Sequence, residues 1–285
     1  MSAAPSVATN TATNGVDTRT VQRDEADAVR QFYAENGYAI LRNVVSKDKL
    51  SGLHATIVEE FDRAKRSGTL FSGGGTLTGH LNCLPGEAAR FGHDEIVQKG
   101  VVDLLASMFK KPLGQLNVGL NYNMPKSVAQ HYHVDSQFTD EFVIANVAVV
   151  DTDLVNGAID VVPGTHKKFY KYWRFAVERP YRFARRLEMK QGDVLLRTSN
   201  LWHRGMPNLS TAPRPMLAMT FGEKRRADDQ DPFKLNEGKV LFYPNWYRPN
   251  LLGRLRERTF VAAPITYSAY RFARSLFGTK GYGTP

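Results

Sequence analysis

The sequence predicts a mainly β fold, a β-barrel or jelly roll, with helices supporting it from outside. Short apolar runs follow one another between residues 116 and 221, and turns rich in Gly, Pro, Asp and Asn separate them. Many short strands at this spacing are typical of sandwiches and barrels. The part of the chain before these runs has helical periodicity instead. Because helices come first and strands second, the helices are expected to pack around one sheet structure.

Helical support is expected over residues 24–110. Asp24 is placed to cap a first helix, and residues 38–45 read as a buried strand after it. Ser46 is placed to cap a second helix, and the glycine-rich residues 71–86 are expected to be a loop before a third. The apolar faces of the second and third helices are expected at Leu50, Leu53, Ile57 and Phe61, and at Val97, Val101, Leu104, Leu105 and Met108, respectively.

The jelly-roll core is expected over residues 115–222. Its strands are LNVGLNYN, FVIANVAVV, AIDVV, DVLLRT and MLAMTF. Residues 167–190 interrupt these strands, and an insertion of this length is typical of a lid over a barrel mouth. Residues 228–285 carry short helical pieces and are expected to wrap the barrel. Residues 21–285 then form one domain, and residues 1–20, which have little to bury, are expected to be a disordered tail.

The net charge of +10 is concentrated in two segments. Residues 167–190 contribute +7 and residues 248–280 contribute +6, so the rest of the chain sums to −3. Either these segments form a solvated basic face, or they bind an anionic substrate, an anionic partner or a membrane surface. No nucleic-acid-binding motif accompanies the charge, so no nucleic acid partner is expected.

The remaining composition is that of an ordinary globular protein, with 42% hydrophobic and 23% charged residues. Cys83 is the only cysteine, which excludes an internal disulfide framework. No apolar stretch approaches the roughly 20 residues that cross a bilayer, and the first residues lack the layout of a secretory signal. A cytoplasmic location is therefore expected.

The segment from Gln130 to Asp135 carries the strongest chemical signal. On a strand, residues two apart face the same side, so His133 and Asp135 are expected to point together. An imidazole and a carboxylate supply two ligands of the facial triad that holds non-haem Fe(II) and leaves three positions open. The alternative is an exposed or hydrogen-bonded His–Asp pair without metal. His203, which follows the strand DVLLRT, is the candidate for the third ligand.

Arg214 suggests what else the metal site binds. It follows His203 by eleven residues and directly precedes an apolar strand. The planar guanidinium of arginine pairs with a carboxylate through two hydrogen bonds, which suits the distal carboxylate of 2-oxoglutarate. Ser210 is placed to add a hydroxyl donor to the same carboxylate.

Three motifs in this order and spacing resemble the phytanoyl-CoA dioxygenase superfamily over about residues 30–222. They are His133-x-Asp135, the run GAIDVVPGTH at 157–166, and His203-x-Gly205-x-x-Asn208-x-Ser210-x-x-x-Arg214. The stretch LWHRGMPNLSTAPRPMLAMT is most similar to bacterial natural-product members such as kanamycin B dioxygenase. The resemblance implies a double-stranded β-helix, that is, a cupin-like jelly roll. It further implies iron ligation by His133, Asp135 and His203, anchoring of 2-oxoglutarate by Arg214, and use of Fe(II), 2-oxoglutarate and O2.

The chain departs from the family pattern near the co-substrate. The family often has tryptophan or another large residue where this chain has Asn146, which can hydrogen-bond instead. Asn121, on the strand before the metal-binding segment, is a second candidate contact. Asp135 is present where a halide-binding variant needs Gly or Ala, so the resemblance favours hydroxylation over halogenation.

Four residues are candidates for substrate contact. His80 and Asn82 lie in the glycine-rich loop, which either lines the barrel mouth or merely connects helices. His131 is expected in the pocket wall, with a structural role and metal ligation in a His131-x-His133 pair as alternatives. Trp173 belongs to an aromatic cluster that either stacks on substrate or packs.

These observations predict an Fe(II)- and 2-oxoglutarate-dependent dioxygenase. Its substrate is expected to be a small molecule, anionic or not: a secondary metabolite, a saccharide or a lipid-like compound that is hydroxylated or oxidised further at an aliphatic C–H. One alternative is a cupin-type metal enzyme that uses His131, His133 and His203 without 2-oxoglutarate. Another is a non-catalytic barrel that binds a ligand.

Overall fold

The computed structural model describes residues 23–70, 77–109, 111–114, 116–139, 141–222, 230–243, 250–256, 258–259 and 263–277. The tail predicted for residues 1–20 lies outside the described residues. Among the helices of the described part of the chain, none is long and apolar enough to cross a membrane.

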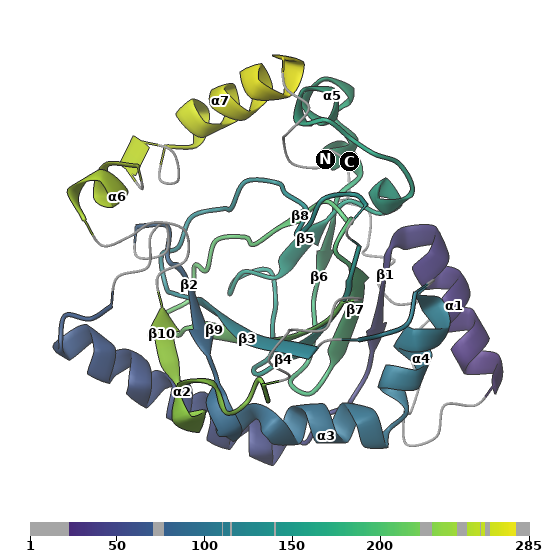
Figure 1. The fold of residues 1–285 in the computed structure, drawn as a ribbon, viewed down its shortest axis with the longest axis vertical. Coiled ribbons are helices and arrows are strands. Elements are labelled where there is room, and N and C mark those ends of the chain that lie inside the picture. The colour runs from purple at the N-terminus through teal and green to yellow at the C-terminus, as the bar shows by residue number, and fades with distance from the viewer. Residues whose placement is uncertain are drawn as a thin grey trace, which may run out of the picture.

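Two antiparallel sheets form the centre of the molecule (Figure 1). The larger sheet has seven strands in the order β1-β7-β4-β9-β3-β2-β10, and the smaller has three in the order β6-β5-β8. The strands are β1 (Tyr38–Leu41), β2 (His80–Leu84), β3 (Leu116–Asn123), β4 (Val143–Ala148), β5 (Ile159–Val161), β6 (Arg185–Leu187), β7 (Val194–Thr198), β8 (His203–Arg204), β9 (Arg214–Phe221) and β10 (Leu241–Tyr243). The prediction of a mainly β jelly roll with supporting helices is confirmed.

Four helices cover the outer face of the larger sheet, and three lie on the other side of the molecule (Figure 1). They are, in chain order, α1 (Arg23–Asn36), α2 (Lys47–Arg66), α3 (Arg90–Gln98) and α4 (Val101–Met108), then α5 (Tyr172–Glu178), α6 (Leu251–Arg256) and α7 (Pro264–Phe277). Short 3₁₀ turns lie at Gly86–Ala89, Thr165–Lys167, Pro180–Phe183 and Leu235–Gly238.

The predicted apolar stripe of α2 is buried as expected, and it packs with α1, α3 and α4 on outward side chains of the larger sheet. Ser46 precedes α2 but makes no side-chain cap; instead its backbone N–H donates to Glu95 Oε2 at 2.7 Å. The strand predicted for 38–45 ends at Leu41, because Asn43 has a φ of 53°, outside the range of a strand.

Two sequence-based predictions about the helical part were wrong. The third helix is two helices, because Gly100 adopts a left-handed φ of 71° between α3 and α4. Val97 consequently lies 46% exposed, and Ile96 is buried in its place. The predicted loop at 71–86 contains β2, which pairs with β3 and β10 inside the larger sheet. The glycines that suggested a loop precede this strand.

Residues 167–190 are only partly an insertion. Their last part contributes β6, which pairs with β5 in the smaller sheet, so the segment predicted as a lid ends before Arg185. The remainder includes α5, whose Phe175 ring stacks on Trp202 with ring centroids 3.9 Å apart. This contact ties α5 to the outside of the smaller sheet.

Candidate active site

The two predicted metal-binding segments meet through their backbones. His133 and His203 exchange two backbone hydrogen bonds of 3.0 Å each, and the Asp135 N–H donates to Ser199 O at 2.9 Å. Contrary to the prediction, His133 and Asp135 do not lie on a regular strand, since His133 forms only an isolated bridge. The side chains still point together because the bridge holds the segment against β8.

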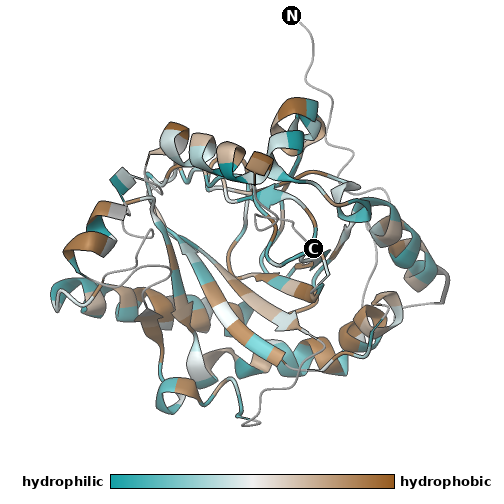
Figure 2. Cartoon of the chain, turned by 45° about the horizontal axis from the view of Figure 1, so that its top comes forward, coloured by the Kyte–Doolittle hydropathy of each residue, from teal (hydrophilic) through white to brown (hydrophobic). Residues whose placement is uncertain are grey.

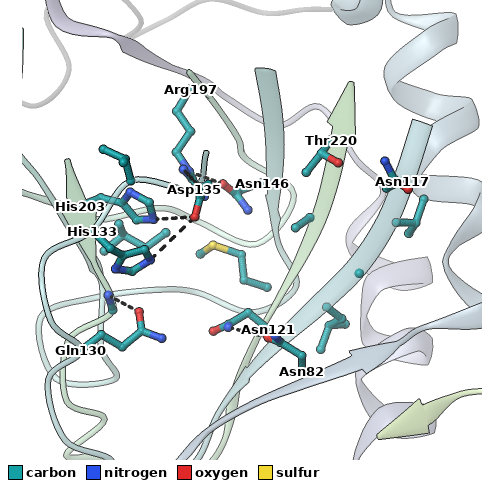
Figure 3. Close-up of a pocket in the computed structure, with 18 of the residues that line it drawn as sticks. Asn82, Asn117, Asn121, Gln130, His133, Asp135, Asn146, Arg197, His203 and Thr220 are labelled. Carbon is teal, nitrogen blue, oxygen red and sulfur yellow. Dashed lines mark hydrogen bonds and ion pairs between the residues drawn. The ribbon is translucent and has the colours of Figure 1, made fainter. Parts of the chain in front are cut away.

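Three potential ligand atoms converge at this point (Figure 3). Asp135 Oδ1 lies 3.8 Å from His133 Nε2 and 3.6 Å from His203 Nε2. Candidate ligand atoms of these three residues all lie within 4.8 Å of one another. In the described part of the chain, this is the one group of three or more His, Cys, Asp or Glu residues with that geometry.

Backbone contacts orient both imidazoles for ligation. His133 Nδ1 lies 2.8 Å from His131 O and His203 Nδ1 lies 2.9 Å from Leu201 O. A carbonyl only accepts, so each Nδ1 carries the proton and each Nε2 keeps its lone pair. Burial lowers the pKa of His203 to about 3 and also lowers that of His133. Both rings are therefore neutral at pH 7, which is the state that binds metal.

Arg197, which the sequence analysis did not select, holds the third member of the cluster. Its Nη1 donates to Asp135 Oδ2 at 2.5 Å, and its Nε donates to Asn146 Oδ1 at 2.9 Å. Burial alone would raise the pKa of Asp135, but the Arg197 guanidinium and the two imidazoles hold it well below its usual range. One carboxylate oxygen thus pairs with arginine and the other faces the imidazoles. An arginine inside the apolar strand DVLLRT was the available signal, since a buried guanidinium needs an acceptor.

Arg214 lies at the start of β9 and is 1% exposed. Its Nη2 donates to Gly157 O at 2.9 Å, whereas its buried Nε has no hydrogen-bond partner. Burial lowers the pKa of Arg214 to about 10, so the side chain stays charged at neutral pH. No carboxylate of the described residues pairs with it. A buried cation in this condition is suited to an anionic ligand.

His133, Asp135 and His203, which we call the candidate metal cluster, share one pocket of about 480 Å³ with Arg214 between the two sheets. On the larger sheet, Arg214 lies at the start of β9, opposite Asn123 of β3. Arg197 of β7 lies near the other end of β9, because both Arg197 and Thr220 are opposite Ile144 of β4. Thr220 follows Arg214 by six residues. The pocket therefore runs along the inner face of β9. Its polar lining residues are Asn82, Asn117, Asn121, Gln130, His133, Asp135, Asn146, Arg197, His203, Arg214 and Thr220.

Three predicted contacts line this pocket. Asn121 Nδ2 donates to Asn82 Oδ1 at 3.1 Å across the β2–β3 pair, and Asn146 lies at the metal side with Arg197. Gln130 also lines it and accepts from the Gly205 N–H at 2.8 Å through Oε1. Asn117 and Thr220 were missed because nothing in an isolated strand shows which face meets a cavity.

Four other candidates do not line the pocket. Ser210 Oγ closes a local turn with Asn208 Oδ1 and Ala212 O, at 2.6 and 3.0 Å. Buried His80 is held by Val128 O at 2.7 Å. His131 packs against the Tyr267 ring with centroids 4.8 Å apart, because the segment is not a regular strand. Trp173 lies on α5, outside the smaller sheet.

Comparisons with known proteins agree with this architecture. The model of the family described as "Phytanoyl-CoA dioxygenase (PhyH)" matches residues 33–216. The chain belongs to this family, whose members use Fe(II), 2-oxoglutarate and O2. The matched range contains every residue of the candidate metal cluster as well as Arg197 and Arg214.

Solved structures similar to this chain share the fold at low sequence identity. The non-haem α-ketoglutarate-dependent carbocyclase SnoK from nogalamycin biosynthesis has a TM-score of 0.57 and 18% identity, over 72% of this chain and 85% of its own. AviO1 from Streptomyces viridochromogenes Tue57 has a TM-score of 0.56 and 18% identity, over 69% and 94%. HygX from Streptomyces hygroscopicus, solved with nickel and 2-oxoglutarate, has a TM-score of 0.51 and 17% identity, over 74% and 94%.

Proposed function

We propose that this protein is an Fe(II)- and 2-oxoglutarate-dependent dioxygenase that oxidises an aliphatic C–H bond of a small molecule. The observation that carries the proposal is a 2-His-1-carboxylate cluster in one pocket with Arg214, a buried arginine that pairs with no carboxylate of the described residues. Such a cluster leaves metal positions open for a chelating co-substrate and for O2.

The residues fit a resident metal ion. His133 and His203 would bind it through Nε2, because backbone carbonyls occupy both Nδ1 positions. Asp135 would bind through Oδ1, because Arg197 occupies Oδ2. Arg197 therefore favours ligation through a single carboxylate oxygen and preserves the open positions.

The residues also fit the co-substrate. Arg214 would pair with the distal carboxylate of 2-oxoglutarate, which satisfies its unpartnered Nε and neutralises its charge. Asn121 and Asn82, on neighbouring strands of the same pocket wall, would orient the co-substrate or substrate through their amides. Iron, O2 and 2-oxoglutarate together supply a decarboxylation to succinate and CO2 that is coupled to C–H oxidation.

The substrate is proposed to be a secondary metabolite, a saccharide or a lipid-like molecule. The local likeness of residues 201–220 to kanamycin B dioxygenase supports a natural product, as does the description of SnoK as an enzyme of nogalamycin biosynthesis. Hydroxylation is the proposed reaction, since Asp135 supplies a third protein ligand. SnoK is described as a carbocyclase, so ring closure is the nearest alternative outcome at the same site.

The cupin-type alternative with His131 as a ligand gains no support from the geometry. The His131 ring lies against Tyr267, and its Nδ1 lies 3.5 Å from Ser268 Oγ on α7. A non-catalytic barrel that binds an anion would account for Arg214 but would give no reason for the His133–Asp135–His203 cluster in the same pocket.

The test is anaerobic loading of the protein with Fe(II) and then 2-oxoglutarate, followed by visible absorption. A metal-to-ligand charge-transfer band is expected in the wild type, weaker at equal co-substrate concentration in Arg214→Met, and absent in His203→Ala. A full band in His203→Ala would overturn the ligand assignment, and no band in the metal-loaded wild type would overturn use of 2-oxoglutarate.

A further inference from the structure

The two basic segments of the sequence come together on one side of the molecule. Trp173 N on α5 donates to Ser275 Oγ on α7 at 2.9 Å, and the Arg271 guanidinium lies 3.9 Å from the centroid of the Tyr172 ring. Figure 1 shows α5 and α7 side by side, with α6 continuing away from the start of α7. We call the described residues of 167–185 and 250–277 the basic cap.

Helix α7 has its polar side toward the protein. Arg271 and Ser275 are buried, and Arg271 Nη1 donates to Tyr132 O at 2.8 Å. The apolar residues Ile265 and Phe277 are instead 86% and 90% exposed. A helix of a globular protein normally buries its apolar face, so this reversed arrangement leaves an apolar face without a partner in the described chain.

The rest of the basic cap continues the pattern. On α6, Leu251 is 85% exposed and Leu252 and Leu255 are also exposed. In the turn after α5, Phe183 is 78% exposed. Figure 2, coloured by hydropathy, shows apolar positions along both C-terminal helices. The exposed apolar residues therefore extend over α6, α7 and the turn after α5.

Exposed cations occur in the same segments as these apolar residues. The described residues of the basic cap include one acidic residue, Glu178. The exposed cations of the cap are Lys167, Lys168, Arg174, Arg179, Arg182, Arg185, Arg254, Arg258 and Arg274. Some pair locally, as Arg174 does with Glu178, but the net charge of the cap remains strongly positive.

We propose that the basic cap binds the surface of a membrane that contains anionic phospholipid. Exposed Phe, Leu and Ile side chains enter the boundary between headgroups and acyl chains, while the surrounding Lys and Arg side chains meet the phosphates. A nucleic acid would match the charge but would leave the exposed apolar side chains without a partner. The inference does not depend on the chemistry of the pocket.

The experiment is flotation of the full-length protein with vesicles of phosphatidylcholine alone or with roughly 30% phosphatidylserine, at low and high NaCl. Binding to the anionic vesicles at low salt is expected, with a loss of roughly tenfold or more on pure phosphatidylcholine or at high salt, where charge is screened. Equal binding to both vesicle types, or to neither, would overturn the proposal.

Matched variants test whether vesicle binding depends on the apolar residues of the basic cap or on exposed apolar residues anywhere on the surface. The pair Ile265→Ser and Phe277→Ser should weaken binding roughly tenfold or more, because both side chains lose contact with the apolar boundary. The control pair Val155→Ser and Leu209→Ser removes apolar side chains that are exposed elsewhere and should bind as wild type does. If the two pairs behave alike, the cap is not the binding surface.

The charge is tested in the same way. Arg182→Glu with Arg258→Glu should abolish salt-sensitive binding, whereas Lys65→Glu with Arg66→Glu on α2 changes the net charge equally and should not. Thermal unfolding at the wild-type temperature checks that each variant folds. Sedimentation checks self-association: a wild-type dimer that Ile265→Ser and Phe277→Ser convert to a monomer would make the cap a subunit interface and overturn the proposal.

Discussion

Arg197 and Arg214 line the same pocket, but within the described residues Arg197 has a carboxylate partner and Arg214 has none. Arg197 pairs with Asp135 and also donates to Asn146. Arg214 is more deeply buried, donates to one backbone carbonyl and leaves Nε without a partner. Buried guanidinium groups are rarely left in this state, because removing the charge from water is costly.

The difference indicates two roles within one cavity: Arg197 holds a side chain of the protein in place, whereas Arg214 is available to bind a ligand. At the metal side, the protein supplies both charges, so the cluster is organised before any ligand arrives. At the Arg214 side, the protein supplies one charge, and we infer that the ligand supplies the other.

Replacement of Asp135 or His203 by Ala should abolish turnover. Each change removes one of three metal ligands, and the loss of succinate release should exceed the roughly 100-fold typical of losing an outer partner of a ligand. His131→Ala is the control, because its ring packs on Tyr267 and does not face the cluster. Metal content and succinate release are the measurements. Full activity in His203→Ala would contradict the site.

Arg197→Met should destabilise the metal-free protein by about 2 kcal/mol, because it removes a charge-assisted hydrogen bond to the Asp135 carboxylate, whose side chain is 24% exposed. Mn(II), added in place of Fe(II) to avoid oxidation, should raise the unfolding temperature of this variant more than that of the wild type, since the metal takes over as counter-charge. Arg214→Met is the matched comparison and should cost the metal-free protein little. Equal destabilisation by the two variants would remove the distinction between the arginines.

Arg214→Lys should raise the KM for 2-oxoglutarate about 10- to 100-fold, which corresponds to the roughly 1.5–3 kcal/mol of a hydrogen bond to a charged group. Lysine keeps the charge but not the two parallel donors. Metal affinity should stay unchanged, which distinguishes this end of the pocket from the other. Steady-state kinetics with 2-oxoglutarate varied make the measurement, and an unchanged KM would assign the anchor to another residue.

Asn146→Ala should have the smallest effect and should act on the metal side. It removes one acceptor of Arg197, worth about 1 kcal/mol, so Mn(II) affinity should fall less than tenfold. A rise in the KM for 2-oxoglutarate with unchanged metal affinity would instead support the sequence-based prediction that Asn146 contacts the co-substrate.

Much of the site could be predicted before the structure. His133, Asp135, His203 and Arg214 were selected from residue type, spacing and resemblance, and all four line one pocket. Ser210 was selected on the same grounds but lies in a turn with Asn208. Spacing alone does not show which way a hydroxyl points when a local backbone acceptor competes for it.

The division into a helical part followed by a part built of strands, the burial of the α2 stripe and the residue types of the His133–Asp135–His203 cluster could be read from the sequence alone. These follow from periodicity and side-chain chemistry, which are local properties. Tertiary structure alone decided that Arg197 reaches Asp135 from a strand 62 positions away. It also decided that β2 lies inside the sheet and that α7 turns its polar side inward. Each of these depends on which distant segment a residue meets, and no local pattern encodes that partner.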